Sequence, residues 1–397
     1  MRKVEALVLG AGPVGTIAAS RLAAMNIDVM LCEAQPSCAH DLRASTFHAS
    51  TLEMLDEIGA ADPLIARGLK APVYHMRDRK SGDVIDFDLT EIADHARFPF
   101  RLQCEQFHMA NLLAHRMIDD PKIDMRFNAR LIDAREVADG VIATLEIEGV
   151  PTEIHTKFLI GADGSHSVVR QKMDVEFEGF TYEEKFVSLS TALPIEDHVP
   201  NLSYVNYISD PDEWLVLLRV PTLWRVLVPA DGALSNEELI SDKNAAKVFS
   251  RIVGDIAVET EHRTIYRVHQ RVAKNFVKGR MLLIGDAAHL NNPLGGFGMN
   301  SGIHDAWNLT EKLYSILRND GDREQLDRFD RQRRTVTLNF IQAQTIENMA
   351  FMEQGAGEAS RLRRARMAEI HADDGLRRDY LLKQAMFKSL EEAEMIA

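Results

Sequence analysis

The glycine-rich segment GAGPVG at residues 10–15 constrains the fold more than any other part of the sequence. It follows an apolar stretch, Val4–Leu9, that predicts a strand. A helical pattern over 16–25 comes next, and then a second predicted strand, Val29–Cys32. A strand, a glycine turn, a helix and a strand in this order indicate the first βαβ unit of a dinucleotide-binding fold.

Each glycine of this turn has its own physical role. Gly10 permits the tight turn, Gly12 lets a pyrophosphate approach the backbone, and Gly15 lets the helix pack closely. The acid at the end of the second strand is placed to accept a hydrogen bond from an adenosine ribose. The turn alone suits NAD as well as FAD. The cofactor-binding residues predicted here are Gly10, Gly12, Pro13, Val14, Gly15 and Glu33.

A second constraining segment covers residues 279–309. The short apolar run Met281–Ile284 predicts a strand that delivers Asp286 to its carboxyl edge, where ligands of open α/β sheets bind. Glycines follow, and then a helical pattern from about Met299. The free amides at that helix N-terminus suit a ligand atom that becomes anionic, such as the pyrimidine edge of a reduced flavin. Asp286 is either a ligand for a sugar hydroxyl or a simple cap of the strand end.

A third segment, FLIGADGSHSVVR at 158–170, has the same character. An apolar strand ends at Gly161, an Asp163-Gly164 turn follows, and a helix is predicted from Ser165 with Arg170 in its first turns. A helix N-terminus beside a cation predicts another binding site for an anion.

In this order, the three segments resemble those of the single-component FAD-dependent aromatic hydroxylases, the para-hydroxybenzoate hydroxylase family of class A flavoprotein monooxygenases. The family pattern GxDGxxSxVR matches residues 161–170, and its pattern RAxxxxxxTLE matches residues 43–53. Many members have glutamine where this chain has Phe297. The resemblance implies cofactor-binding roles for Arg43, Gln103, Leu131, Asp163, Arg170, Asp286, Pro293, Gly295, Gly298, Met299 and Asn300.

The predicted elements and the resemblance together imply an α/β fold, with a Rossmann-like FAD-binding domain, an inserted antiparallel β-sheet substrate domain and C-terminal helices. We predict the FAD-binding domain at 1–71, 101–178 and 276–330, and the substrate-binding domain at 72–100 and 179–275. The C-terminal helical segment is predicted at 331–397. Within these limits, we expect one helix from Leu102 to Ile118 and one amphipathic helix from Leu376 to Ala397.

No short motif marks the substrate-contacting side chains, which the resemblance places on the inserted sheet. Alternation puts Leu215, Leu217 and Arg219 on one face of their strand and Val216 and Leu218 on the other. A group that favours the phenolate form of a substrate would make its ring nucleophilic. The alternative for each such residue is a solvated sheet face. The catalytic candidates are Pro293, Tyr204, Tyr207, His75, His48 and Arg219.

Composition limits the partners. A net charge of −14 on 397 residues argues against nucleic acid and against anionic membrane surfaces. No apolar run reaches membrane-spanning length. The scattered Cys32, Cys38 and Cys104 contain no CxxC, which predicts reduced thiols in a cytoplasmic protein and no metal site. The oligomer is left open between a monomer and a homodimer.

The resemblance implies an FAD-dependent monooxygenase. NADH or NADPH would reduce the flavin, dioxygen would form a C4a-hydroperoxide, and one oxygen atom would pass to an electron-rich phenolic or N-heteroaromatic substrate. The main alternative is a flavin-dependent dehydrogenase or reductase of the same fold without oxygen insertion. A flavin-dependent halogenase is disfavoured because WRVLVP at 224–229 does not match the WxWxIP motif. A redox sensor would need a basic DNA-reading module, and none is visible.

Overall fold

The computed structural model describes residues 1–39, 44–353 and 357–397. Its first large sheet has the strand order β17-β18-β11-β1-β2-β8, and β10 and β9 extend it from β11. The pairs β18–β11, β11–β1, β1–β2 and β2–β8 are parallel. The strands of this sheet are β1 (Arg2–Leu9), β2 (Val29–Cys32), β8 (Ile123–Arg126), β9 (Ala129–Val137), β10 (Gly140–Ile147), β11 (Val150–Gly161), β17 (Val277–Lys278) and β18 (Met281–Leu283).

Apolar side chains bury this sheet on both faces, as expected for parallel strands. Leu7, Val8, Leu159 and Leu282 have no exposed surface. Helix α1 packs against α8 and α4 along the sheet. The helices of this part are α1 (Pro13–Ala24), α2 (Ala49–Glu57), α3 (Ala61–Ile65), α4 (Gln106–Ile118), α5 (Val168–Lys172) and α8 (Phe297–Arg318), with the short turn η3 (Gly285–Ala287).

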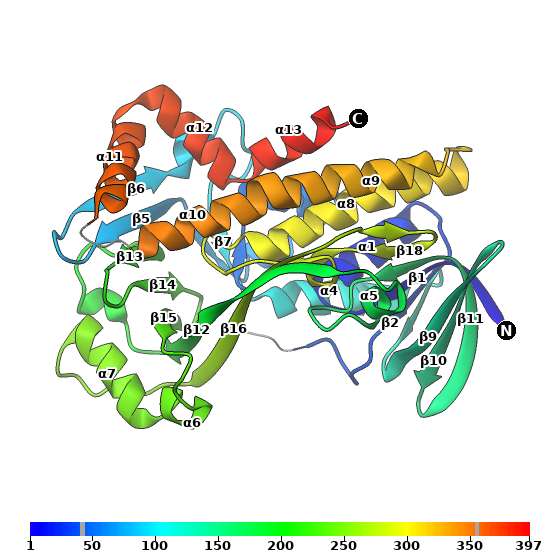
Figure 1. Cartoon of the computed structure of the whole chain (residues 1–397), viewed down its shortest axis with the longest axis horizontal. Coiled ribbons are helices and arrows are strands. Elements are labelled where there is room, and N and C mark those ends of the chain that lie inside the picture. The colour runs from blue at the N-terminus through cyan, green and yellow to red at the C-terminus, as the bar shows by residue number, and fades with distance from the viewer. Residues whose placement is uncertain (40–43, 354–356) are drawn as a thin grey trace.

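The second large sheet has the order β19-β16-β12-β15-β14-β13-β5-β6. The long strands β12 and β16 extend from it toward the half of the molecule that contains the first sheet (Figure 1). Its pairs are antiparallel, except that β5 runs parallel to β13 with His75 opposite Asn206. Its strands are β5 (Val73–Asp78), β6 (Val84–Asp88), β12 (Phe177–Thr191), β13 (Val205–Ser209), β14 (Leu215–Arg219), β15 (Trp224–Ala230), β16 (His262–Ala273) and β19 (His289–Leu290).

Helices cover the outer side of this sheet. Leu215, Leu217 and Trp224 pack with Phe249 of α7 in one apolar cluster, whereas Val216 faces a different cluster, so the predicted alternation is confirmed. The two layers and the C-terminal helices confirm the predicted α/β fold with an inserted, mainly antiparallel sheet. The short helices here are α6 (Asn236–Leu239), α7 (Asp242–Val253), η1 (Leu89–Ile92) and η2 (Ile195–Asp197).

A helix beginning at Leu102 was a wrong expectation. Residues Arg101–Gln103 form strand β7, the centre of a small sheet with β3 (Thr46–Phe47) and β4 (Leu69–Ala71). Leu102 is fully buried there, and helix α4 begins only at Gln106. Strands on both sides of β7 satisfy the hydrogen-bonding groups of its backbone. A short apolar sequence does not by itself reveal that such partner strands exist.

The C-terminal segment is helical, but residues 376–397 do not form one helix. Helix α12 (Asp374–Gln384) ends before α13 (Phe387–Met395), because Met386 between them has a left-handed backbone with φ of 68° and is fully buried. The preceding helices are α9 (Glu324–Val336), a π-helical stretch η4 (Thr337–Gln342), α10 (Ala343–Met352) and α11 (Glu358–Ala372).

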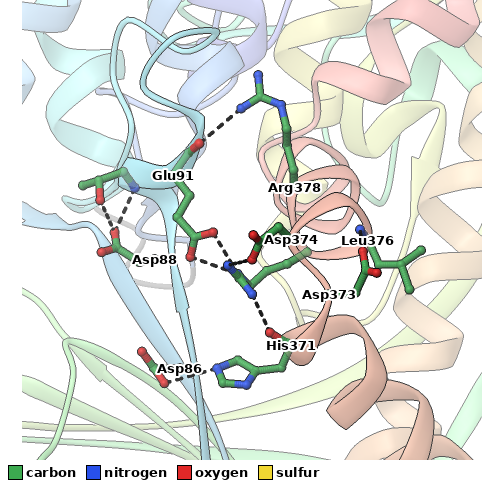
Figure 2. A network of polar contacts seen from close by, with 10 residues as sticks. Asp86, Asp88, Glu91, His371, Asp373, Asp374, Leu376 and Arg378 are labelled. Atoms are coloured by element: carbon green, nitrogen blue, oxygen red, sulfur yellow. Dashed lines mark hydrogen bonds and ion pairs between the residues drawn. The ribbon is translucent and has the colours of Figure 1, made fainter.

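Polar contacts fasten these last helices to the hairpin of β5 and β6. Figure 2 shows His371 of α11 beside Asp86 and Arg378 of α12 beside Glu91. Arg377 also pairs with Glu91 at 2.8 Å. The C-terminal helices therefore cover the β6 edge of the second sheet, whose residues lie in the first quarter of the sequence.

Candidate active site

An elongated cavity of about 470 Å³ lies at the carboxyl edge of the parallel strands. Met299, at the start of α8, lines it, and so does the exposed carboxylate of Asp286 after β18. The predicted cofactor residues that line this cavity are Gly10, Gly12, Pro13, Val14, Glu33, Leu131, Asp163, Asp286 and Met299. The strand ends thus bring together residues from three separate sequence segments.

The glycine turn leaves space on the cavity side only. A Cβ atom built on Gly10 would lie 2.3 Å from the carbonyl oxygen of Ala162, and one built on Gly15 would lie 1.9 Å from that of Gly10. A Cβ atom on Gly12 would meet nothing within 4 Å. Gly12 therefore opens the start of α1 toward the cavity, which fits the approach of a diphosphate to that backbone.

Glu33 stands at the end of β2 and is anchored by the backbone. Its Oε2 accepts a hydrogen bond of 2.8 Å from the Ala11 amide, and its Oε1 accepts one of 3.0 Å from the Gln35 amide. These bonds hold the carboxylate beside the glycine turn, where it can still accept from a ribose hydroxyl.

The carboxylate of Asp163 caps a helix while it lines the cavity. It accepts hydrogen bonds from Ser167 and from the amides of Val168 and Val169 at the start of α5. Burial raises its pKa above the ordinary value, although these hydrogen bonds work in the opposite direction.

Arg170 does not line the cavity. Its guanidinium donates to the carbonyl oxygens of Ala287 and Ser165 at 2.8 and 2.7 Å and lies over the Phe177 ring. In the structure it connects the loop after β11 to the loop after β18. Gln103 is likewise not among the lining residues, and its Oε1 accepts a hydrogen bond from the Thr46 hydroxyl at 3.1 Å.

A buried ion-pair cluster supports the loop that carries Asp286. Asp305 of α8 accepts from the amide of Gly285 at 3.1 Å and pairs with His289 and Arg333, each at 2.7 Å. Burial alone would raise its pKa, but the interactions and hydrogen bonds with His289 and Arg333 hold the pKa of Asp305 at about 2. The carboxylate is therefore ionised and anchors the loop.

His48 and Asn300 hold the glycine-rich loop before α8. The Nε2 of His48 donates to the carbonyl oxygen of Gly295 at 2.9 Å, and the His48 ring stacks on Phe297. Asn300 donates to the carbonyl oxygens of Thr46 and Gly296 and accepts from the amide of His48. Burial holds the pKa of His48 well below its usual range, so the ring is neutral.

A second cavity of about 200 Å³ adjoins the first, since Ala44 and Met299 line both. The glycine loop supplies one wall and the second sheet the other. The loop residues are Asn291, Pro293, Leu294, Gly296 and Gly298, and the sheet residues are Ser188, Tyr207, Val216, Leu218, Arg225, Leu227 and Tyr266; Ala44, Ser45, Thr46 and Met299 complete the lining.

Arg225 is the charged group of this second cavity and was missed in the sequence. It is 4% exposed, and its Nη2 lies 3.5 Å from a carboxylate oxygen of Glu105. A buried cation in an apolar wall is suited to an anionic ligand. Strand alternation opposite Trp224 was the one signal that could have located it.

The catalytic candidates separate into two groups. Tyr207 and Pro293 line the second cavity, whereas Tyr204, just before β13, is exposed. His75 and Arg219 also lie elsewhere: burial and Arg77 lower the pKa of His75 beside Asn206, and Arg219 lies 3.9 Å from Glu196, close to the Trp224 ring. The predicted cofactor residue Arg43 lies outside the described residues.

Comparison with known proteins fits this geometry. The sequence model of a family described as "FAD binding domain" matches residues 3–344. Para-nitrophenol 4-monooxygenase of Pseudomonas sp. strain WBC-3 is 29% identical over 385 residues, covering 95% of this chain and 94% of that protein. The chain belongs to the FAD-dependent aromatic monooxygenases.

Other relatives of this monooxygenase point the same way. Pentachlorophenol 4-monooxygenase of Sphingobium chlorophenolicum is 26% identical over 90% of this chain and 66% of that protein. The crystal structure of p-nitrophenol 4-monooxygenase from Pseudomonas putida DLL-E4 superposes with a TM-score of 0.91 at 28% identity, over 98% of this chain and 99% of that one.

The residues of the larger cavity fit FAD. The unobstructed Gly12, the carboxylate of Glu33 at the end of β2 and the α8 N-terminus line one continuous cavity with the polar groups that a flavin adenine dinucleotide needs. Among the described residues of this monooxygenase, no helix is both long enough and apolar enough to cross a membrane. The same ranges contain no group of three acidic, histidine or cysteine side chains that could hold a metal ion.

Proposed function

We propose that this monooxygenase hydroxylates a small phenol that binds as its phenolate anion in the second cavity. The observation that carries the proposal is the buried Arg225 guanidinium in a wall that is otherwise largely apolar, next to Met299 and Pro293 of the flavin side. A fixed cation beside the ring favours the ionised substrate, and ionisation makes the ring more nucleophilic. Two relatives are named as monooxygenases of para-nitrophenol and pentachlorophenol, and these names support this substrate class.

In this proposal FAD occupies the larger cavity and NADH or NADPH is the electron donor. When bound and reduced, FAD would supply the activation of dioxygen that lets one oxygen atom pass to the ring while the other leaves as water. The protein's own residues position and protect the reactants. The α8 amides stabilise negative charge on the flavin ring, and Val216, Leu218 and Leu227 exclude water from the substrate side.

We assign roles to two polar side chains of the second cavity, Arg225 and Tyr207. Arg225 attracts and orients the phenolate, and Glu105 fixes the guanidinium from behind. Tyr207 contributes a hydroxyl from β13 to the same cavity. Pro293 and Gly298 shape the boundary to the flavin ring without a side-chain donor.

We also propose the division into an FAD-binding domain and an inserted substrate domain at the predicted boundaries. The hairpin of β5 and β6 supports this division, because it pairs with β13 and not with the parallel sheet. The buried, unlinked Cys32, Cys38 and Cys104 support a reducing cytoplasmic environment.

The decisive experiment measures NAD(P)H oxidation, oxygen uptake and aromatic product over a panel of substituted phenols and hydroxylated N-heteroaromatics. We expect at least one phenol to stimulate NAD(P)H oxidation and to appear as an oxygenated product in proportion to the oxygen consumed. Substrate-dependent flavin reduction without any oxygenated product would instead favour a dehydrogenase of the same fold.

A further inference from the structure

Arg101 is a buried cation next to the second cavity that the proposed function does not yet use. It begins strand β7, and only 1% of its surface is exposed. In the described part of the chain no carboxylate pairs with it, and its Nε and Nη2 have no hydrogen-bond partner. A guanidinium in a low-dielectric interior without a counterion is costly, so its position requires a specific explanation.

The surroundings of Arg101 are aromatic. Its guanidinium carbon lies 4.0 Å from the centroid of the Tyr74 ring and 6.0 Å from that of Tyr207. Its Nη1 donates a hydrogen bond of 3.3 Å to the Tyr207 hydroxyl. The face of the Tyr74 ring thus stabilises the cation and aligns it with Tyr207.

The other titratable groups around Arg101 do not neutralise it. Burial raises the pKa of the Tyr74 and Tyr380 hydroxyls, and burial together with Arg101 keeps His48 neutral by lowering its pKa. Arg225, which lines the second cavity, pairs with Glu105 and not with Arg101. The positive charge of Arg101 therefore acts on any ligand atom that contacts the Tyr207 hydroxyl.

The direction of this hydrogen bond determines what Tyr207 can offer. Arginine has only donors, so the Tyr207 oxygen accepts from Arg101 and its own hydrogen must point elsewhere. Tyr207 lines the second cavity, on the same sheet wall as Val216 and Arg225. A hydroxyl held in this way presents a donor to the cavity, which suits an anionic oxygen better than a neutral one.

We propose that Arg101 is a positioning residue that fixes Tyr207 as a hydrogen-bond donor to the phenolate oxygen of the substrate and thereby makes the cavity select the ionised phenol. This inference rests on the proposed function, because it assigns the anionic oxygen of that same substrate to Tyr207. Arg225 attracts the anion from the β15 side, and Arg101 acts from behind the tyrosine.

The test uses the oxidised FAD-loaded protein without NAD(P)H, so that no turnover occurs, and 4-nitrophenol as a chromophoric probe. Difference absorbance against pH gives the midpoint at which the bound probe ionises. In wild type we expect this midpoint to lie below that of free 4-nitrophenol. In Arg101→Met it should rise by about one pH unit, which is about a tenfold loss of preference for the phenolate. 4-Nitroanisole, which cannot ionise, should bind equally to both proteins.

Two further variants test whether Arg101 acts through Tyr207. Tyr207→Phe should raise the midpoint at least as much as Arg101→Met, and the double variant should equal Tyr207→Phe alone. Arg101→Lys keeps the charge but not the planar fork, and it should fall between wild type and Arg101→Met. If Arg101→Met does not retain FAD, Arg101→Lys is used in its place. A midpoint in Arg101→Lys equal to that of wild type would then overturn the inference.

The outcomes separate the two proposals. A wild-type protein that binds neither 4-nitrophenol nor any phenol of the panel would overturn the proposed function and this inference with it. Normal binding of 4-nitrophenol with the same midpoint in wild type and Arg101→Met would overturn the inference alone. Additive shifts in the double variant would also overturn it, because Arg101 would then act independently of Tyr207.

Discussion

The carbonyl oxygen of Gly10 packs so closely on Gly15 that a methyl group on Gly15 would lie 1.9 Å from it. The neighbouring Gly12, by contrast, faces an unobstructed space at the start of α1. The three glycines of one turn are thus required for two different reasons, and substitutions can separate them.

Gly15→Ala should destabilise the protein itself, by about 1–3 kcal/mol, because a backbone carbonyl must move. Gly12→Ala should leave the stability of the apoprotein unchanged, since its φ of −75° suits alanine, but should weaken FAD binding by about ten- to a hundredfold. Thermal unfolding of the apoprotein and FAD titration distinguish the two effects. Equal loss of stability in both variants would contradict this division of roles.

Asp286→Ala should weaken FAD retention without unfolding the loop that carries it. Loss of a charge-assisted hydrogen bond to a ribityl hydroxyl costs about 1.5–3 kcal/mol, or roughly ten- to a hundredfold in affinity. Asp305 and Arg333 hold the same loop independently, so the melting temperature of the apoprotein should stay the same. Unchanged FAD affinity would reduce Asp286 to a strand-end residue.

Arg219, on the strand next to that of Arg225, serves as a control for Arg225. Arg225 lines the second cavity, whereas Arg219 interacts with Glu196 on the other side of the sheet. Arg225→Met should raise the Kd of a phenolate substrate by about ten- to a hundredfold, and Arg219→Met should change it less than about twofold. Equilibrium binding to both variants checks this. A larger effect at Arg219 would exclude the second cavity as the substrate site.

Acid should destabilise the protein partly through His304. Burial, and to a smaller extent Arg333, lowers its pKa from the ordinary 6.5 to about 3. The unfolded chain therefore binds a proton that the folded protein does not, and stability is fully present above pH 6.5 and falls as the pH decreases toward 3. The slope from one such histidine is at most about 1.4 kcal/mol per pH unit.

The measurement is urea unfolding between pH 7 and pH 4 for wild type and His304→Gln. The variant should be less stable at pH 7, because a side chain that touches Thr51 is replaced, but its stability should decline less steeply with acid. Parallel pH profiles would show that His304 does not contribute to the decline.

The parts of the site that the sequence could predict are those with local causes. Gly10, Gly12 and Asp286 lie in short segments where a turn, a strand end and a helix start follow one another, so few residues fix the geometry. Arg225 and Arg101 could not be found in this way. Their importance arises from burial against residues far away in sequence, such as Glu105 and Tyr207, and neither lies in a motif.

Arg170 and Gln103 illustrate a different limit. The resemblance implies cofactor-binding roles for both, whereas in the structure both side chains hold loops, through Ala287 and Thr46. The break at Met386 was equally invisible, because a left-handed methionine in a helical pattern is stabilised by tertiary burial and not by local preference.

The larger cavity takes its walls from segments far apart in the sequence, with Gly12 near the N-terminus and Met299 at the start of α8. A ribosome therefore exposes the glycine turn long before the strand and helix that complete the flavin site have been synthesised. The neighbouring parallel strands β1, β11 and β18 also lie far apart in the sequence, so their pairing cannot be complete until β18 has been synthesised. The complete cavity therefore cannot form until α8 has been synthesised, and a nascent chain that stalls before α8 would have the glycine turn without the residues that complete the cavity.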